Sequence, residues 1–351
     1  MANTLRLEKE YALKMIQEIH LHELGKEADQ IRRRLHPEEV VTFVVDRNIN
    51  YTNVCINRCK FCAFWRPKED PEAYVITYDE LSQKIEETIA KGGTQILLQG
   101  GVHPELGLDF YVEMLRFIKK NFKIHVHGFS PPEITFLSRK EGLSVREILI
   151  RLKEAGLDTI PGGGAEILSD RVRIRQSPNK IKSDEWLSVM REAHLLGMKT
   201  SATMMFGSID SDEDIIEHLD KLRSLQDETA GFTAFIPWSF QPWNTELKRE
   251  NPEIEPAGAV KYLKVLALSR IYLNNFPNIQ VSWVTQGIKI AQVGLRFGAN
   301  DFGSTMLEEN VVRAAGVSYR VTMDEIISAI KSAGFKPAQR DTYYNVLKYF
   351  E

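Results

Sequence analysis

The amino-acid sequence predicts an α/β protein folded as a (β/α)8 barrel of the TIM type. Short apolar runs alternate with charged amphipathic stretches about eight times, and glycines end several of these stretches directly before the next apolar run. No linker or low-complexity segment divides the 351 residues. Alternating strands and helices build parallel sheets, and eight such units are enough to close a barrel. We therefore expect one α/β barrel with helical additions at both ends.

The expected elements follow one another in a regular order. Residues 5–35 carry apolar side chains at helical spacing and end at His36-Pro37, which predicts an N-terminal helix. The expected strands are 48–53, 94–99, 124–129, 158–161, 200–206, 232–237, 280–284 and 300–303. The expected helices between them are 78–91, 108–121, 144–155, 183–196, 212–226 and 256–274. The chain is thereby divided into a helical extension (1–40), a barrel (41–306) and a C-terminal helical cap (307–351).

Composition and charge exclude several classes of protein. Hydrophobic residues make up 43% of the chain and charged residues 26%, which is typical of globular proteins. The net charge of −3 provides no basic field to attract nucleic acid or an anionic membrane. The N-terminus is amphipathic and charged, unlike a signal peptide, and no apolar run is long enough to span a bilayer. We expect a cytoplasmic protein that binds neither nucleic acid nor membranes.

All three cysteines lie within eight residues, in the segment Cys55-Ile-Asn-Arg-Cys59-Lys-Phe-Cys62. Structural cysteines are usually scattered singly, and three thiols on one tight loop cannot all pair as disulfides. Two kinds of site remain open. One is a four-iron cluster on three thiolates, with one iron open to a small molecule. The other is a zinc-organised binding protein, in which a histidine completes the site. The strand–helix alternation favours the cluster, because a closed zinc site does not need a barrel mouth.

Polar and glycine-rich segments follow the predicted strands, where an α/β barrel builds its active site. The cysteine loop follows the first strand, and the other such segments are 99–105, 127–133, 161–166 and 237–244. Neither glycine cluster matches the dinucleotide motif G-x-G-x-x-G or the phosphate loop G-x₄-G-K-[ST]. Because both motifs are missing, we exclude a Rossmann dinucleotide site and a nucleoside-triphosphate site.

The cysteine motif, with Phe61 before its last cysteine, resembles the radical S-adenosylmethionine (SAM) superfamily. From about residue 40 to the C-terminus, the chain is similar to the menaquinone-futalosine and deazaflavin branch of that superfamily. The matching segments are Asn48-Ile-Asn-Tyr-Thr-Asn-Val-Cys55, Gln99-Gly-Gly, His127-Gly-Phe-Ser-Pro-Pro-Glu133, Pro161-Gly-Gly-Gly-Ala-Glu166 and Arg296-Phe-Gly-Ala-Asn-Asp301. The resemblance implies a barrel of the radical SAM kind and a [4Fe–4S] cluster bound by Cys55, Cys59 and Cys62. The open iron would bind SAM, whose cleavage yields methionine and a 5′-deoxyadenosyl radical.

Within this branch, the segments Phe232-Thr-Ala-Phe-Ile-Pro-Trp-Ser-Phe-Gln-Pro242 and Ser282-Trp-Val-Thr-Gln-Gly287 are most similar to the futalosine cyclases. The resemblance implies abstraction of the ribose C4′ hydrogen of dehypoxanthine futalosine. The carbon radical then adds to the aromatic ring of the same molecule, and one proton and one electron are lost. A low-potential electron donor such as flavodoxin or ferredoxin would be the partner. The alternatives are an aminofutalosine synthase and a subunit of the deazaflavin-precursor (FO) synthase.

The resemblance also implies a set of SAM-binding residues. These candidates are Phe61, Gln99, Gly100, Gly101 and Glu166. The backbone of Phe61 would meet the adenine, the Gln-Gly-Gly segment would receive the methionine end, and Glu166 would hold the ribose hydroxyls. A carboxylate that accepts from two hydroxyls is reasonable chemistry, although an acid at a helix N-terminus is an alternative interpretation. Lys180 and Lys182 are further candidates to pair with the carboxylate of SAM.

Several residues are candidates to contact the substrate. His127 and His103 are the candidate proton acceptors, because histidine titrates near neutrality and both residues lie at strand ends. His125, two residues before His127, points to the same side of its strand. Trp238 and Trp283 would form aromatic walls, and Asp301 would anchor sugar hydroxyls. The run Arg171-Val-Arg173-Ile-Arg175 is a candidate to neutralise a substrate carboxylate, and the alternative interpretation, which we favour, is a surface charge cluster.

Overall fold

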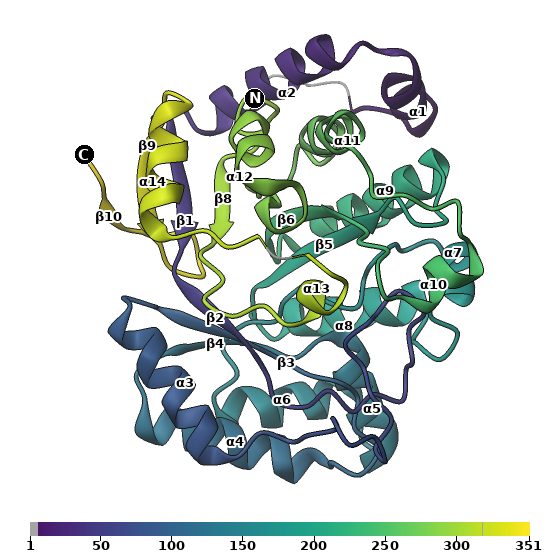
Figure 1. The fold of residues 1–351 in the computed structure, drawn as a ribbon, viewed down its shortest axis with the longest axis vertical. Helices are drawn as coiled ribbons and strands as arrows, with labels where there is room; N and C mark the ends of the chain where they lie inside the picture. The colour runs from purple at the N-terminus through teal and green to yellow at the C-terminus, as the bar shows by residue number, and fades with distance from the viewer. Residues whose placement is uncertain (1–5, 318) are drawn as a thin grey trace.

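The computed structural model describes residues 6–317 and 319–351 and confirms a barrel of parallel strands surrounded by helices (Figure 1). The wall strands are β1 (Val40–Val44), β2 (Asp46–Asn50), β3 (Gln95–Gln99), β4 (His125–Gly128), β5 (Thr200–Phe206), β6 (Phe232–Ser239), β7 (Asn278–Ile279) and β8 (Asp301–Ser304). β2, β3 and β4 pair in that order, as do β5, β6 and β7, and β8 pairs with β1. Single-residue bridges at Thr159, Ile160 and Gln280 join these groups, so the wall closes.

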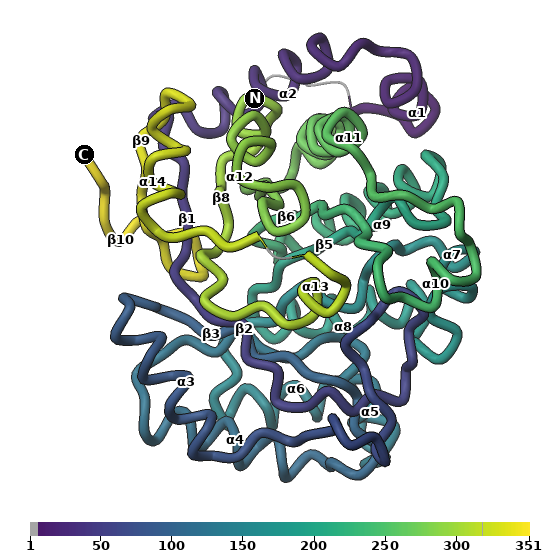
Figure 2. Tube along the Cα trace, in the orientation of Figure 1, coloured from purple at the N-terminus to yellow at the C-terminus, as the bar shows by residue number. Residues whose placement is uncertain are grey.

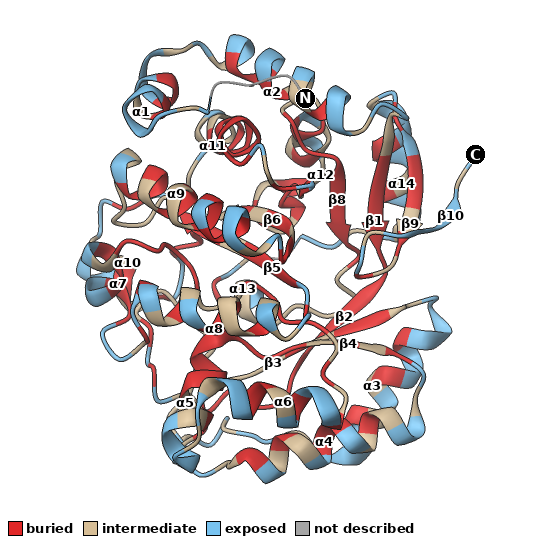
Figure 3. Ribbon diagram, turned by 180° about the vertical axis from the view of Figure 1, so that it is seen from behind, coloured by how far each residue is buried: buried red, intermediate tan, exposed pale blue. Residues whose placement is uncertain are grey.

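Helices cover the outside of this wall. They are α3 (Tyr78–Ala90), α4 (Leu108–Asn121), α5 (Pro131–Glu141), α6 (Val145–Ala155), α8 (Ser183–Leu195), α9 (Asp212–Thr229), α11 (Ala259–Tyr272) and α12 (Trp283–Gly294). The short helices α7 (Asp170–Gln176) and α10 (Glu246–Glu250) lie beside the cysteine loop, where Lys60 hydrogen-bonds to the backbone of Gln176 and Leu247. Capping boxes that begin at Thr77, Ser144 and Ser211 set the starts of α3, α6 and α9. Their inner faces are buried against the strands and their outer faces are exposed (Figure 3).

The N-terminal extension differs from the single helix that was expected over residues 5–35. It forms two helices, α1 (Lys9–Glu18) and α2 (Leu21–Leu35), separated by extended backbone at Ile19 and His20. The break lets the two helices pack on different parts of the barrel: α1 lies against α9 and α11, and α2 lies along α11 (Figure 2). A continuous helix could not have followed both surfaces.

The C-terminal segment contains the expected helices, α13 (Val311–Ala314) and α14 (Met323–Ser332), but it continues into strands. β9 (Lys336–Arg340) pairs in parallel with β1, and β10 (Val346–Tyr349) pairs antiparallel with β9. β1 therefore has β9 on one side and β8 on the other. The sequence pattern did not predict this hairpin, which closes one end of the barrel.

The strand expected at 280–284 is wrong. β7 covers only Asn278–Ile279, Gln280 forms one bridge to Asp301, and α12 begins at Trp283. Ser282 is the N-cap residue of α12, and its hydroxyl lies 2.9 Å from that of Thr285 across the first turn. The strand expected at 158–161 is reduced to the bridges of Thr159 and Ile160.

Among residues 6–317 and 319–351, no helix combines the length and the apolar character needed to cross a membrane.

Candidate active site

A cavity of about 410 Å³ lies inside the barrel and reaches the C-terminal ends of the strands. Its wall includes most of the residues that the sequence singled out. These are Cys55, Cys59, Cys62, Phe61, Gln99, Gly100, Gly101, His127, Glu166, Lys180, Trp238 and Trp283. His103, Lys182 and Asp301 are not among the lining residues. The structure thus gathers residues from segments far apart in the sequence around one space, and their individual roles stay predictions.

Backbone hydrogen bonds hold the cysteine loop at the mouth of the cavity. The N–H of Cys55 donates to the carbonyl of Arg66 at 3.1 Å, and the N–H of Cys62 donates to that of Cys59 at 3.0 Å. Burial and the neighbouring charge of Cys59 raise the pKa of the Cys62 thiol to about 12. Binding of a cationic group would displace this proton, because the thiolate is the ligand.

The thiols fit a cluster better than a single ion. In the part of the chain that the structure describes, no three His, Cys, Asp or Glu side chains are grouped to hold one metal ion. A tetrahedral zinc would bring its sulfur ligands within about 3.8 Å of one another. A [4Fe–4S] cluster binds each cysteine through a different iron, so its sulfur ligands stand farther apart. Three soft thiolates on one loop fit such a cluster and leave one iron without a protein ligand.

The strand-end glycines pack directly against this loop. A Cβ atom on Gly101 would lie 2.1 Å from the carbonyl oxygen of Val54 and 2.9 Å from the Cβ of Cys55. A Cβ atom on Gly100 would lie 2.6 Å from the ring of Tyr51. Glycine is required here because the protein approaches itself closely, which fixes the cysteine loop relative to β3.

A buried ion pair lies beside the cysteine loop. The Lys180 ammonium is 3.1 Å from both carboxylate oxygens of Glu166, and it lies 5.1 Å from the centre of the Phe61 ring. Burial alone would lower the pKa of Lys180, but the charges of Cys59 and Glu166 outweigh it and raise the pKa. Lys180 is therefore a fixed cation between a predicted cluster ligand and a predicted SAM-binding carboxylate. Lys182 instead lies at the N-cap of α8.

The interpretation of the 171–175 run as a surface cluster is wrong for Arg173. This side chain is buried, and its guanidinium donates to the carbonyl oxygens of Gly164, Ala165 and Ile181. Arg173 therefore holds the glycine-rich loop that carries Glu166. Its neighbour Arg171 remains half exposed and pairs with Asp214.

Glu133 is a cavity residue to which the sequence gave no role. It accepts hydrogen bonds from the hydroxyls of Tyr51 and Ser130 and from the N–H of Gly100, the last at 3.3 Å. Burial raises the pKa of Glu133 to about 7, although these hydrogen bonds oppose the shift. The motif that contains Glu133 was recognised, but burial of a carboxyl depends on tertiary packing and has no local sequence signal.

Asp301 does not contact the cavity, which corrects its assignment as an anchor for sugar hydroxyls. The side chain is fully buried, and its oxygens accept from Arg340, from the Thr42 hydroxyl at 2.6 Å and from the Gly303 N–H at 2.9 Å. No oxygen is left free for a ligand. Arg340 itself lines the cavity, together with Tyr344, so the C-terminal segment forms the floor.

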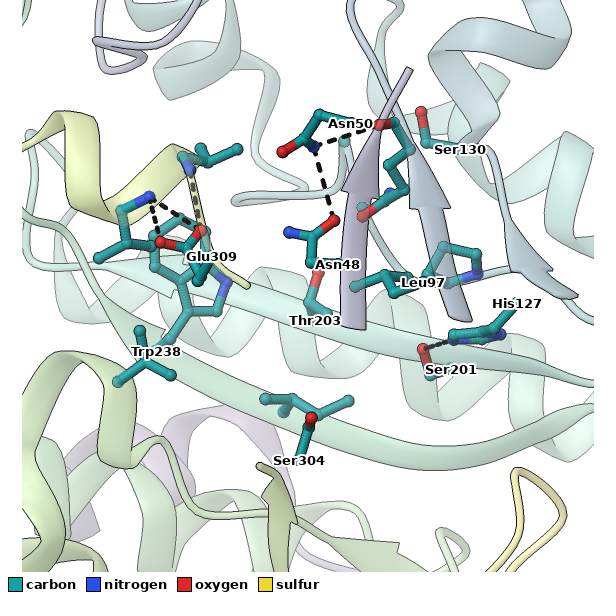
Figure 4. Close-up of a pocket in the computed structure, with 18 of the residues that line it drawn as sticks. Asn48, Asn50, Leu97, His127, Ser130, Ser201, Thr203, Trp238, Ser304 and Glu309 are labelled. Carbon is teal, nitrogen blue, oxygen red and sulfur yellow. Dashed lines mark hydrogen bonds between the residues drawn. The ribbon is translucent and has the colours of Figure 1, made fainter. Parts of the chain in front are cut away.

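The two candidate proton acceptors occupy different places. His127 lines the cavity, and burial lowers its pKa to about 3. Its Nε2 lies 3.5 Å from the hydroxyl of Ser201 (Figure 4). His103 is buried outside the cavity wall, where its Nδ1 accepts from the N–H of Glu105 at 3.1 Å. The geometry therefore favours His127 over His103.

Aromatic and polar side chains complete the wall. Trp238 comes from β6, whereas Trp283 begins α12 rather than ending a strand, and its indole N–H donates to Ser304 at 2.9 Å. At the mouth, Glu309 caps α13 and lines the cavity (Figure 4). Asn310 donates to the side chain of Asn50 at 3.1 Å, which ties the α13 segment to β2.

A family model described as the Radical SAM superfamily matches residues 49–222, and one described as the CofH/MqnC C-terminal region matches residues 229–351. A cyclic dehypoxanthine futalosine synthase of Halalkalibacterium halodurans is 45% identical over 99% of this chain and 94% of that protein. The chain belongs to the radical SAM superfamily. Members of this superfamily use a [4Fe–4S] cluster and SAM, so the protein is a radical SAM enzyme.

Other relatives of this radical SAM enzyme carry two different names. A cyclic dehypoxanthine futalosine synthase of Streptomyces coelicolor is 42% identical over 97% of the chain and 86% of that protein. A 5-amino-6-(D-ribitylamino)uracil–L-tyrosine 4-hydroxyphenyl transferase of Methanopyrus kandleri is 46% identical over 89% of the chain and 86% of that protein.

Solved structures confirm the radical SAM barrel. Methylornithine synthase PylB matches with a TM-score of 0.73 at 17% identity, over 95% of both chains. The hydrogenase maturase HydG of Carboxydothermus hydrogenoformans matches with a TM-score of 0.75 at 17% identity, over 97% of this chain and 77% of that one. At these identities the likeness concerns the fold alone.

Proposed function

We propose that this radical SAM enzyme is a futalosine cyclase of menaquinone biosynthesis, which converts dehypoxanthine futalosine to its cyclic, spiro-fused form. The observation that carries the proposal is the 45% identity, over 99% of the chain, to an enzyme named for this product.

When bound, the cluster and SAM would supply the 5′-deoxyadenosyl radical that takes hydrogen from C4′ of the ribose.

We expect both groups to bind at the mouth of the cavity, where the three cysteines lie. Cys55, Cys59 and Cys62 would hold three irons, each through one thiolate. SAM would lie between the cysteine loop, the end of β3 and Glu166. The ammonium of Lys180 would neutralise the carboxylate of Glu166 there. The strand ends that line the space are fixed by the barrel, so the reacting groups are held before substrate arrives.

The deeper part of the cavity would fold the substrate. Both reacting atoms belong to one flexible molecule. Holding this molecule in a near-attack shape makes a conformer that is rare in solution the dominant one in the cavity. Trp238 and Trp283 line the space with aromatic rings, and Asn48 and Asn50 line it with amide groups. Figure 4 shows Trp238, Asn48 and Asn50. The α13 segment at the mouth and Arg340 at the floor limit access of water, which protects a radical from side reactions.

The proposal is tested with the anaerobically purified enzyme, chemically reduced and incubated with SAM and dehypoxanthine futalosine. We expect 5′-deoxyadenosine together with a spirocyclic product two hydrogens lighter than the substrate. Mass spectrometry and NMR of the product identify it. Cleavage of SAM without this product would contradict the cyclase assignment.

A second activity is favoured by one specific observation, the 46% identity to a 4-hydroxyphenyl transferase. The same reduced enzyme is therefore incubated in parallel with SAM, L-tyrosine and 5-amino-6-(D-ribitylamino)uracil. Transfer of the 4-hydroxyphenyl group to the uracil, with no cyclisation of dehypoxanthine futalosine, would assign the enzyme to that activity instead.

The electron that starts each turnover is expected from a low-potential donor of the flavodoxin or ferredoxin kind. Replacing the chemical reductant by reduced flavodoxin, and separately by reduced ferredoxin, tests this partner. Formation of 5′-deoxyadenosine with either protein supports it. A lack of turnover with both, in an enzyme that is active with the chemical reductant, contradicts it.

A further inference from the structure

One threonine hydroxyl joins two imidazole rings inside the barrel. Thr159 Oγ1 lies 2.7 Å from Nδ1 of His127 and 2.8 Å from Nε2 of His125. On the cavity side, Nε2 of His127 lies 3.5 Å from Ser201 Oγ (Figure 4). On the other side, Nδ1 of His125 lies 3.9 Å from a carboxylate oxygen of Asp158. These groups lie in one row that is hydrogen-bonded from Ser201 to His125, and the last step, from His125 to Asp158, is longer than a hydrogen bond.

The two ends of the row differ in their contact with solvent. His127 and Ser201 line the cavity, and Thr159 in the middle is only 2% exposed. The side chain of His125 is 17% exposed and that of Asp158 is 31% exposed. The row therefore leads from the cavity wall, through a dry stretch, to a carboxylate that water reaches.

The local fold explains why these groups meet. His125 and His127 are two residues apart on β4, so both rings stand on the same face of the strand. A parallel bridge pairs His127 with Thr159, which brings the hydroxyl between the two rings. A hydroxyl both donates and accepts a hydrogen bond, so it can pass a proton from one imidazole to the next.

We propose that His127, Thr159 and His125 form a proton relay that carries a proton from the cavity to solvent during cyclisation. This proposal rests on the function proposed above. That reaction must release a proton inside the cavity, because an aromatic ring carbon that has gained a new bond still carries hydrogen. The cavity end of the relay, Nε2 of His127, is the atom positioned to take it.

The step balances as follows. A ring C–H bond breaks, and its proton goes to Nε2 of His127. The two electrons of that bond and the unpaired electron restore one π bond, and the remaining electron leaves to a one-electron iron–sulfur acceptor. The Nδ1 proton of His127 passes to Thr159, and the Thr159 hydroxyl proton passes to Nε2 of His125. The Nδ1 proton of His125 then passes to Asp158 or to water, so the relay residues stay neutral.

The electrostatic setting directs the proton outward. Burial, together with the charges of His125 and Arg340, lowers the pKa of His127 to about 3, so a proton is not retained there. Burial also lowers the pKa of His125, but the charges of Asp158 and Asp341 oppose this effect, while Lys119 reinforces it. A positive charge is therefore better tolerated at the outer end of the row than at the cavity.

The test compares Thr159→Val with Thr159→Ser in the reduced holoenzyme. Valine fills the same space without a hydroxyl, whereas serine keeps it. We expect the valine variant to form the spirocyclic product at least about tenfold more slowly, and the serine variant to stay within about twofold of the unmodified enzyme. Thr88→Val is the matched control, because this buried threonine lies in α3, where its hydroxyl bonds only to the carbonyl of Lys84.

A second measurement separates proton transfer from folding. In a single turnover, the valine variant should still yield 5′-deoxyadenosine within about twofold of the unmodified enzyme, because hydrogen abstraction precedes proton loss. The solvent deuterium isotope effect on product formation should rise in this variant and not in the serine variant. A merely structural threonine would move neither quantity.

If Thr159→Val folds poorly, a second variant tests the relay independently. His125→Asn can still hydrogen-bond to Thr159 but cannot relay a proton, and it does not line the cavity. Its defect should match that of Thr159→Val, and the double variant should be no slower than either one, because both changes break one path. Equal product rates for Thr159→Val and Thr159→Ser would overturn the relay alone. If the unmodified enzyme cleaves SAM without forming the spirocycle, the proposed function and the relay both fall.

Discussion

The guanidinium of Arg340 is held by the carboxylate of Asp301, with nitrogen–oxygen distances of 2.6 and 3.0 Å. The pair joins β9 to β8 across the floor of the cavity, where both side chains are buried. The charge of Asp301 contributes to a raised pKa of Arg340, which stays protonated despite its burial. A buried charge of this kind needs its partner, because neither group can turn to water.

Removing the acid of this pair should destabilise the fold. We expect Asp301→Asn to lower the free energy of unfolding by about 3–5 kcal/mol, because Arg340 keeps a buried charge without a counter-ion. Urea unfolding measures the change. Asp227→Asn is the control: Asp227 pairs with Arg6 on the surface, and its loss should cost less than about 1 kcal/mol. Equal stability of Asp301→Asn and the unmodified enzyme would contradict this account of the floor.

Replacing any cysteine of the loop should abolish SAM cleavage. We expect Cys59→Ala to lose most of its iron and sulfide and to form no 5′-deoxyadenosine, because two thiolates hold a cluster poorly. Metal analysis of the anaerobically purified variants checks this. Ile56→Ala, an exposed position on the same loop, should keep the cluster. One colourless zinc per chain in the unmodified protein, or normal SAM cleavage by Cys59→Ala, would contradict the assignment of an iron–sulfur cluster to this loop.

Glu166 should contribute to SAM affinity. We expect Glu166→Gln to raise the KM for SAM at least about tenfold, because hydrogen bonds to a charged acceptor are worth about 1.5–3 kcal/mol. Steady-state formation of 5′-deoxyadenosine measures it. Glu228→Gln, which removes a surface partner of Arg191, should leave KM unchanged. A loss of stability at unchanged KM would show that Glu166 serves only to neutralise Lys180.

Glu133 should make stability depend on pH. Burial raises its pKa from the ordinary 4.5 to about 7, so the folded chain favours the protonated carboxyl. The resulting stabilisation is fully present below the unfolded pKa near 4.5, and it is lost as the pH rises to about 7. Relative to Glu133→Gln, the unmodified enzyme should lose about 3 kcal/mol of unfolding free energy over this range. Urea unfolding of both proteins between pH 5 and 8 measures the difference, and parallel pH profiles would refute it.

Much of the barrel could be predicted from local sequence patterns. Six of the eight expected strands overlap observed strands, and the expected strand at 158–161 is reduced to two bridges, because hydrophobic periodicity and glycine at helix ends are local signals. The strand expected at 280–284 was wrong, since only Gln280 forms a bridge there. The β9–β10 hairpin could not be predicted this way. Its first strand pairs with β1, nearly 300 residues earlier, and charged or polar residues interrupt its apolar pattern. The boundary at Trp283 was missed because aromatic and β-branched residues favour a strand wherever tertiary packing does not decide otherwise.

The site shows the same division. The three cysteines lie within eight residues, so they are close together in any fold, and the sequence alone could predict their place at the cavity mouth. The roles of single carboxylates could not, because they depend on partners brought from elsewhere. Asp301 is tied to Arg340 of the last strand, and Glu133 to Tyr51 after β2. Their residue types are visible in the sequence, but their burial and their hydrogen-bond partners are not.

The position of β9 beside β1 has a consequence for how the enzyme is made. β1 leaves the ribosome long before both strands that flank it, because β8 and β9 lie more than 250 residues later in the sequence. The edges of β1 therefore stay unpaired while these residues are translated, and an exposed strand edge can pair with wrong partners. A nascent chain that is truncated before Lys336 would emerge with a gap beside its first strand, and such fragments should be prone to aggregate.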